Sequence, residues 1–161
     1  MPHNKQYARD SAETFRIAIT MLYRTVRMVA ESGRHVVVDH VMLYDDTGAC
    51  DELWDCVRFM HGLPVLFAFV DCPVEELIKR ETARGDREIG MAERQHRTLL
   101  PESMYDITIN THTATVEQCA ESIIQKQNVM HNTAGYIAAF ERLYNEMPAA
   151  TRAADYKWLC I

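Results

Sequence analysis

LPVLFAFVDCPVEELIKRETARGD, residues 63–86, places an apolar run directly before a helical pattern. Leu63–Val70 shows no polar alternation, which is typical of a strand buried on both faces of a parallel sheet. Pro73 then stands near the first position of a helix, with Glu75 and Glu76 in its first turn, where acidic side chains interact favourably with the helix dipole. This stretch therefore predicts a β-strand followed by an α-helix, the repeating unit of an α/β fold.

Two further strands are predicted on either side of this unit. His35–Val41 (HVVVDHV) is a β-branched run typical of a buried parallel strand, with Asp39 at its carboxyl end. Tyr105–Asn110 (YDITIN) is the third predicted strand. Because parallel neighbours need a crossover, the intervening helical patterns predict an α/β fold of three layers, a parallel sheet with flanking helices.

Amphipathic helices are expected around these strands. The first has Asp10 or Ser11 as its cap and ends at Gly33, because glycine readily adopts the left-handed conformation that ends helices. Its inward face is predicted from apolar residues three and four apart: Phe15, Ile19, Leu22, Val26 and Val29. Later helices are predicted over residues 51–61, from 73 onward, over 114–127 and around 134–146. We therefore expect an α/β domain over residues 1–127 and a C-terminal helical extension over residues 128–161.

The composition is that of one soluble globular domain. The 161 residues are 48% apolar, and 17 Lys and Arg against 23 Asp and Glu give a formal net charge of −6. That charge predicts no general attraction to nucleic acid or anionic lipid. No apolar run approaches the ~18 residues of a membrane span, and the first ten residues are polar, so a cytoplasmic protein without a membrane segment is expected.

The cysteines and histidines show no metal-site pattern. The five cysteines include no C-x-x-C pair, and the seven histidines include no H-x₃-H or H-E-x-x-H spacing. Cys72 and Cys119 have apolar neighbours, which favours buried free thiols. A disulfide framework and a structural zinc site are therefore both unexpected.

Three groups of residues can carry chemistry, and each follows a predicted strand, where open α/β sheets bind ligands. Asp39 can hold a magnesium ion beside the phosphates of a nucleotide, but the same pattern fits a helix cap or a surface acid. The turn Asn110–Thr113 can contact a nucleotide through its amides and hydroxyls, although an ordinary helix cap needs the same residues. Both interpretations stay open on spacing alone.

The remaining group is the basic segment Lys79–Arg97. Arg80, Arg84 and Arg87 are four and three residues apart, so they share one face of a helix. Guanidinium groups so placed can bind phosphate oxygens in a forked geometry, and two glycines in the segment favour a mobile lid. The alternative is a solvated face on which Glu76 pairs with Arg80.

Ordered pieces of the chain resemble the chloramphenicol phosphotransferase family of P-loop kinases. They are GRHVVVDHVML (33–43), CDELWDCVRFMHGLPVLFAFVDCPVEELIKRETARGDREIGMAERQ (50–95) and MYDITINTHTATVEQCAESI (104–123). The most specific piece is RETARGDREIGMAERQ (80–95), which resembles the lid of that family. The resemblance covers roughly residues 33–124.

The resemblance implies a chloramphenicol phosphotransferase-like small-molecule kinase. Such an enzyme transfers the γ-phosphoryl group of ATP, with magnesium, to a hydroxyl of a small-molecule alcohol, which is chloramphenicol in the member that names the family. Residue by residue, the resemblance puts Asp39 near magnesium, directly or through water. It puts three phosphate-stabilising catalytic residues in the lid: Arg80, Arg84 and Arg87. It also puts Thr111 and Arg84 near the nucleotide.

Two parts of the family pattern have no counterpart in the sequence. Only Gly85–Gly90 has the glycine spacing of G-x-x-x-x-G-K-[ST], and Met91 and Ala92 follow it in place of Lys and Ser or Thr. The aspartate expected as catalytic base has no counterpart either, and His40 stands where a second acid is expected. We therefore expect an N-terminally truncated chain with little or no turnover on its own.

The truncation also bears on the sheet. The resemblance places another strand between His35–Val41 and Leu63–Val70, and without it the two inward edges have no partner. Marginal stability, a rearranged sheet or completion by another chain is expected, which leaves a homo-oligomer open. The alternative function is a non-catalytic binding or regulatory remnant of a P-loop kinase. The acceptor, and any role in antibiotic resistance, self-protection or housekeeping, stays open.

Overall fold

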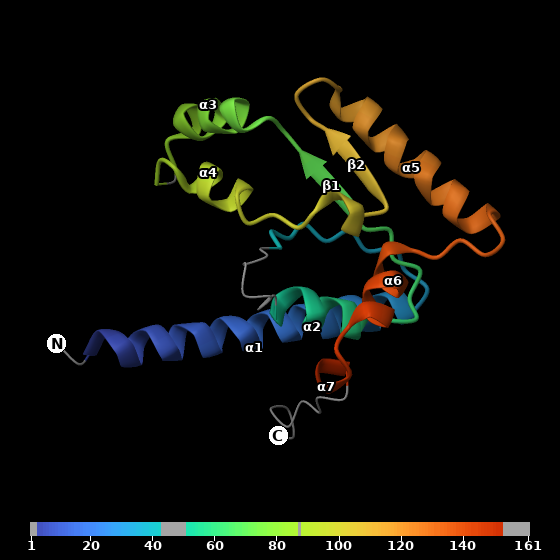
Figure 1. Ribbon diagram of the computed structural model, residues 1–161, viewed down its shortest axis with the longest axis horizontal. Coiled ribbons are helices and arrows are strands. Elements are labelled where there is room, and N and C mark those ends of the chain that lie inside the picture. Colours follow the sequence, from blue (N-terminus) through green and yellow to red (C-terminus); the bar gives the residue numbers. More distant parts are fainter. Residues whose placement is uncertain (1–2, 43–50, 87, 153–161) are drawn as a thin grey trace.

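The computed structural model describes residues 3–42, 51–86 and 88–152, which form a helical protein with a small sheet (Figure 1). The helices are α1 (His3–Glu31), α2 (Asp51–Met60), α3 (Val74–Arg84), α4 (Met91–His96), α5 (Val116–Asn132), α6 (Ala139–Glu146) and α7 (Ala149–Arg152), with a 3₁₀ turn at Glu102–Met104. The strands are β1 (Ala68–Asp71) and β2 (Ile107–Asn110). The protein is therefore of the predicted α/β class.

The two strands are parallel, in the order the sequence predicts. Ala68 pairs with Ile107 and Asp71 with Asn110. The crossover between them contains α3 and α4, and α5 follows β2 and packs against it (Figure 1). Both strands are shorter than expected, but their carboxyl ends lie side by side at one edge, which positions the residues that follow them.

The prediction of a third strand over His35–Val41 is wrong. These residues have no regular secondary structure and follow α1 as an extended trace (Figure 1). Val37 is 97% exposed, which also contradicts the expected burial. A strand is defined by hydrogen bonds to a neighbour, and in the parts of the chain that are described β1 and β2 pair only with each other. The segment has an apolar sequence, but no strand among the described residues pairs with it.

Helix α1 begins earlier than predicted and ends where predicted. It starts at His3, so Asp10 and Ser11 lie inside the helix and are not its cap. The residues before them include Lys, Gln, Ala and Arg, which favour helix, and the helix therefore extends through the predicted cap. The helix ends before Gly33, whose φ of 80° is the left-handed conformation expected there.

Only part of the predicted apolar face of α1 is covered. Ile19 and Val26 pack against the core, whereas Phe15 is 50% exposed and Leu22 is 38% exposed. Helix α2 packs on α1 but has 10 residues against 29. The N-terminal turns of α1 extend beyond the other labelled elements (Figure 1).

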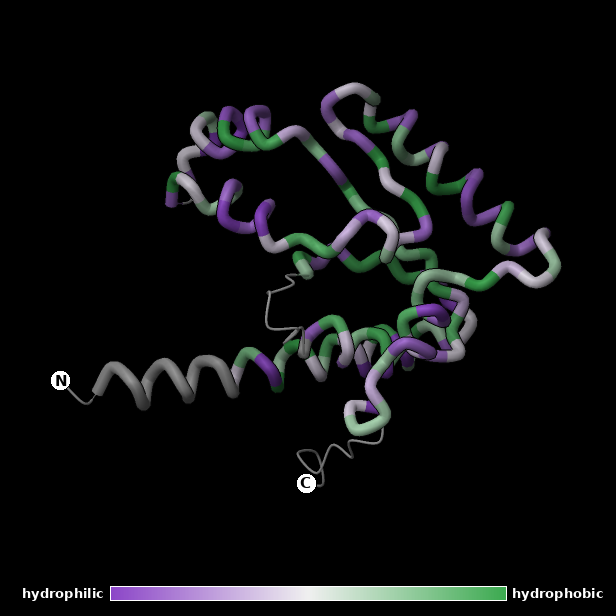
Figure 2. Tube along the Cα trace, in the orientation of Figure 1, coloured by the Kyte–Doolittle hydropathy of each residue, from purple (hydrophilic) through white to green (hydrophobic). Residues whose placement is uncertain are grey.

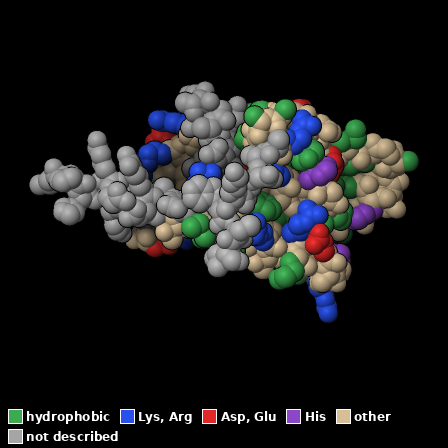
Figure 3. Space-filling model, turned by 90° about the horizontal axis from the view of Figure 1, so that it is seen from below, with side chains coloured by type: hydrophobic (Ala, Val, Ile, Leu, Met, Phe, Trp, Pro, Cys, Tyr) green, Lys and Arg blue, Asp and Glu red, His purple; other side chains and the backbone are tan. Residues whose placement is uncertain are grey.

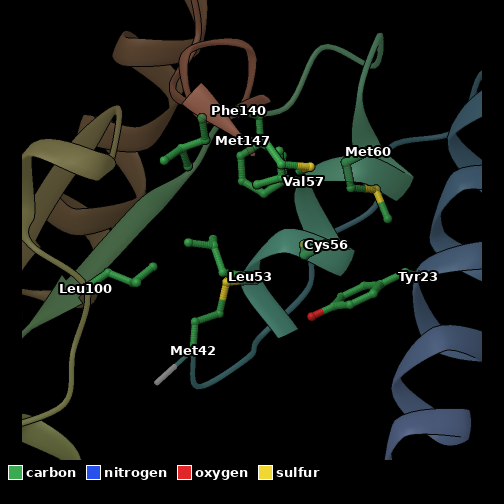
Figure 4. Close-up of a cluster of buried hydrophobic side chains, with 10 residues drawn as sticks. Tyr23, Met42, Leu53, Cys56, Val57, Met60, Leu100, Phe140 and Met147 are labelled. Carbon is green, nitrogen blue, oxygen red and sulfur yellow. The ribbon is translucent and has the colours of Figure 1, made fainter. Parts of the chain in front are cut away.

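The core lies around α2, between α1 and α6 (Figure 4). Leu53 and Val57 of α2 are fully buried, and Phe140 of α6 is 3% exposed. The ring of Phe67, just before β1, meets Phe140 edge-on with centroids 4.9 Å apart. Hydrophobic residues recur along α2 and α6 between hydrophilic ones, as Figure 2 shows, which gives each helix one apolar side for this core.

Asp106 joins the start of the sheet to α6. Its Oδ2 accepts a hydrogen bond from the amide of Phe67 at 2.9 Å. Its Oδ1 accepts from the hydroxyl of Tyr136 at 2.9 Å and from the amide of Ala139 at 2.8 Å. One carboxylate therefore satisfies three donors, one from the residue before β1 and two from the stretch that leads into α6.

Charged side chains are dispersed over the face seen in Figure 3. There Lys and Arg stand among acidic, histidine and hydrophobic side chains and do not form one continuous patch in the coloured part of that view. None of the helices in the described ranges is both long enough and apolar enough to cross a membrane.

Candidate functional site

Thr111 lies at the edge where both strands end. Its amide donates to the carbonyl of Asp71 at 2.9 Å, and its hydroxyl donates to the same carbonyl at 3.1 Å. The next turn is held by Asn110, whose Oδ1 accepts from the amides of His112 and Thr113 at 2.9 and 3.2 Å. Thr111 is thus fixed at the carboxyl edge of the sheet, where ligands of α/β proteins bind.

The turn leads into α5, but the cap of that helix is Thr115, which lies outside the predicted turn Asn110–Thr113, so the capping interpretation of those four residues is wrong. Thr115 is the N-cap, and its side chain accepts from the amide of Gln118 while the Gln118 side chain accepts from the amide of Thr115. This reciprocal pair is a capping box. The helix is therefore capped by Thr115, which leaves Thr111 free of that task.

Arg80 reaches from α3 to Thr111. Its Nη1 lies 3.2 Å from Thr111 Oγ1, and its Nη2 donates to the Thr111 carbonyl at 3.1 Å. Its Nε donates to Glu76 Oε1 at 3.2 Å, so the predicted ion pair with Glu76 is also present. The structure thus brings together two of the predicted site residues, Arg80 and Thr111, and does so with an exposed guanidinium.

The predicted lid, residues 80–95, runs from the C-terminal half of α3 into α4, and the turn between the two helices is bounded by Gly85 with φ of 63° and Gly90 with φ of 93°. Glu81, 8% exposed, holds this turn from inside. Its two carboxylate oxygens accept from the amides of Gly90 at 2.7 Å and Ala92 at 2.8 Å. The backbone amides of Ala92 and Gly90 lower the pKa of Glu81 from its ordinary value.

Glu81 is the lid residue that sequence reasoning missed. It stands in a charged helix among basic neighbours, where an acid is most simply interpreted as a surface side chain. Its partners lie nine and eleven residues further on, beyond helical spacing. The one available signal is a glycine, Gly90, in a left-handed conformation, which makes its amide accessible to a carboxylate.

Of the other two predicted lid arginines, Arg84 lies within the described residues. Arg84 ends α3 with its side chain 59% exposed, and its Nη2 lies 3.1 Å from Asp86 Oδ2. Arg87 lies outside the described residues. On α4, Arg94 lies 3.3 Å from Glu88. Exposed pairs of this kind contribute about 0–1 kcal/mol, so a polyphosphate can replace the carboxylate partners at little cost.

Asp39 is placed elsewhere. It belongs to the strandless segment after α1 and lines an open groove of about 350 Å³ together with Leu22, Val26 and Val38. No recorded contact within the described ranges joins it to Arg80 or Thr111. The expected position of Asp39 at a strand end is therefore wrong, because the strand is absent.

His40, which stands where a second acid was expected, has a structural position. Its Nδ1 lies 3.0 Å from the hydroxyl of Tyr23 in α1, and its Nε2 lies 3.6 Å from Glu52 Oε2 in α2. The Tyr23 and His40 rings also stack, with centroids 5.8 Å apart. His40 thus attaches the segment after α1 to both helices.

The donors on α3 suit an anion better than a metal ion. Arg80 and Arg84 present exposed guanidinium groups, which bind phosphate oxygens, whereas the hydroxyl proton of Thr111 is already donated to the Asp71 carbonyl. Within the residues that the structure describes, no group of three or more His, Cys, Asp or Glu side chains is placed to hold a metal ion. The arrangement can therefore bind a polyphosphate, and it supplies no metal cage of its own.

Residues 4–128 match the family model described as chloramphenicol phosphotransferase-like protein. Two curated proteins of Mycobacterium tuberculosis, from strains CDC 1551 and H37Rv and both provisionally named O-phosphotransferases, are each 27% identical over 127 residues. The match covers 79% of this chain and 52% of each relative, so the chain spans about half the length of the curated relatives it matches. No solved structure matches it significantly.

Proposed function

Since the chain belongs to the chloramphenicol phosphotransferase-like family, we propose that it binds the phosphates of ATP with its lid and takes part in phosphoryl transfer to a hydroxyl of a small molecule. The names of its relatives support O-phosphotransfer as the class of reaction. The single observation that carries the proposal is the contact between Arg80 and Thr111, which joins the lid helix to the carboxyl edge of the sheet.

The proposed binding mode uses charge and exposure together. Arg80 and Arg84 both carry exposed guanidinium groups near the end of α3, with side chains 43% and 59% exposed. A triphosphate carries charge that forked guanidinium donors neutralise well, and such donors stabilise the transferring phosphoryl group. Glu81 keeps the turn between α3 and α4 in place without using these arginines.

Magnesium enters this proposal only together with ATP, which carries the ion and has part of its phosphate charge neutralised by it. Asp39 is the acid that the family resemblance assigns to it, but Asp39 lies in a different segment from the lid. We therefore assign no step through magnesium to the described residues. We propose that the chain's own contribution is to bind and orient the phosphates.

A non-catalytic role is the second candidate, and one observation favours it. The sequence holds no G-x-x-x-x-G-K-[ST] motif, and Met91 and Ala92 follow its one glycine pair of matching spacing. That motif supplies the amides and the lysine that hold the β- and γ-phosphates in P-loop enzymes. A chain without it binds nucleotide through the lid alone, and turnover is then expected to be slow or absent.

Isothermal titration of the purified chain with ATP and magnesium tests the proposal. We expect a dissociation constant that Arg84→Ala raises about tenfold, which corresponds to about 1.4 kcal/mol. Arg16→Ala is the matched control, because it removes one exposed positive charge from α1, away from the lid. The control variant should bind ATP as the unchanged chain does.

Turnover separates the two candidates. The chain is incubated with labelled ATP and a panel of small-molecule alcohols that includes chloramphenicol, and the phosphorylated product is measured. Product formation that depends on Arg84 supports the enzyme, and binding without product supports the non-catalytic role. Absence of ATP binding up to millimolar concentration, or equal loss in Arg84→Ala and Arg16→Ala, contradicts both.

A further inference from the structure

The segment after α1 presents an exposed row of valines. Val37 is 97% exposed, while Val36 and Val38 on either side of it are 38% and 41% exposed. This alternation of exposure along three successive residues is that of an extended chain, whose side chains point to opposite faces in turn. All three valines line an open groove together with Val26 of α1.

The backbone of this segment is available for pairing. Within the described ranges, residues 35–41 make no recorded hydrogen bond to another backbone group. An extended, β-branched stretch without a neighbour is a template for another strand, and soluble proteins usually block such edges. Here no proline or lysine interrupts residues 35–41.

The segment is complementary to a second copy of itself that runs in the opposite direction. In an antiparallel pair of two identical segments with Val37 at the centre, Val37 faces Val37 of the second copy and Val36 faces its Val38. The same register places the imidazole of His35 opposite the carboxylate of Asp39 at both ends, where a ring N–H can donate to the carboxylate. Apolar cross-strand pairs stabilise antiparallel strands by about 0.2–1 kcal/mol each.

We propose that two copies of this chain associate through residues 35–39, paired antiparallel about a two-fold axis at Val37. The pairing satisfies backbone groups of both copies and covers the two Val37 side chains. The contact uses the same residues of both copies, which is the symmetric arrangement of a two-fold dimer. His40, held by Tyr23 and near Glu52, fixes the segment on its own copy while the pair forms. The proposal stands independently of nucleotide binding.

Sedimentation equilibrium over a wide concentration range tests the association. We expect a reversible change from the mass of one chain to twice that mass. Val37→Lys and Val37→Asp each place two like charges face to face at the axis, so each variant should sediment as a monomer. When the two variants are mixed, a lysine faces an aspartate, and a dimer containing one copy of each should return.

Val116→Lys is the matched control, since Val116 is 80% exposed on α5 and lies outside the pairing segment. It should dimerise as the unchanged chain does, and circular dichroism should show that all variants keep their helix content. A chain that stays monomeric at all concentrations overturns the proposal. So do open-ended aggregates, a dimer that persists in Val37→Lys, and a mixture of the two variants that stays monomeric.

Discussion

Arg80 and Thr111 form a two-point contact between α3 and the turn after β2. The guanidinium donates at 3.1 Å to the Thr111 carbonyl and lies 3.2 Å from its hydroxyl, while a third nitrogen donates to Glu76. A forked, planar group can make such contacts together, whereas a lysine ammonium is a single charged point. The start of the lid is therefore oriented by geometry as well as by charge.

Replacing Arg80 should weaken nucleotide binding, and the loss should depend on whether the positive charge is kept. We expect Arg80→Lys to keep part of the ATP affinity, because it keeps the charge, and Arg80→Ala to lose about tenfold, or about 1.4 kcal/mol. Thr111→Val removes one contact and should lose less than Arg80→Ala. Titration calorimetry measures all three, and equal affinities for Arg80→Ala and the unchanged chain would refute a role in binding.

The lid turn should loosen in acid. The pKa of Glu81 is lowered in the folded protein by the amides of Ala92 and Gly90. Its stabilising effect is therefore present above the unfolded-state pKa of about 4.3 and is lost as the pH falls through the lower folded-state value. Hydrogen-exchange protection of the Gly90 and Ala92 amides should fall over that acidic range.

Glu81→Gln provides the comparison for this experiment. Gly90 and Ala92 donate to different oxygens of Glu81, and Gln replaces one of these oxygens with an NH2 group that cannot accept, so protection should already be lower at neutral pH. The amides of α5 serve as an internal reference that the substitution leaves unchanged. Protection at Gly90 and Ala92 that does not vary with pH would show that Glu81 does not hold the turn.

The buried thiol of Cys56 should make the fold sensitive to alkali. Burial raises the pKa of Cys56 to about 12 and also raises that of Tyr23. The unfolded chain then releases protons that the folded chain retains, so the free energy of unfolding falls as the pH rises above about 9, by at most about 1.4 kcal/mol per pH unit for each group. Denaturant unfolding at several pH values measures this slope. We expect a shallower slope for Cys56→Ala, and an unchanged slope would contradict the assignment.

Helix α6 should contribute to stability as a core element. Leu143 is 3% exposed, and its truncation in Leu143→Ala should lower the free energy of unfolding by about 2–5 kcal/mol. The control is Val116→Ala, which shortens an 80% exposed side chain and should change the free energy by less than about 0.5 kcal/mol. Denaturant unfolding compares the two, and similar values would mean that α6 is not part of the cooperative core.

Local patterns predicted the elements that local interactions stabilise. Apolar runs and helix signals within a few residues predict three of these elements: the strand before Pro73, the helix after it and the parallel strand ending at Asn110. The end of α1 at Gly33 follows from the conformational freedom of glycine. Arg80 and Thr111 meet because the carboxyl ends of parallel strands share one edge, which topology alone predicts.

The misplaced elements depend on partners distant in the sequence. His35–Val41 has the composition of a strand, but a strand forms only where another backbone offers hydrogen bonds. The apolar side of α1 was assigned from its period, yet Phe15 is 50% exposed, because a period does not say whether another element covers that side. Asp39 was predicted at the carboxyl end of this strand, so its expected position fails together with the strand. Glu81 was missed because its partners follow a turn that the sequence does not define.

The contacts of Asp106 show that the end of the family similarity is not the end of the folded unit. Similarity to the family ends at residue 128, yet the carboxylate of Asp106, inside that region, accepts from Tyr136 and Ala139 beyond it. A fragment cut at the border of similarity would keep the acceptor, lose two of its three donors and open the hydrophobic core beneath α6. The smallest fragment able to fold cooperatively must therefore extend through α6, and a boundary for expression or domain transfer should be chosen from these contacts and not from the end of the alignment.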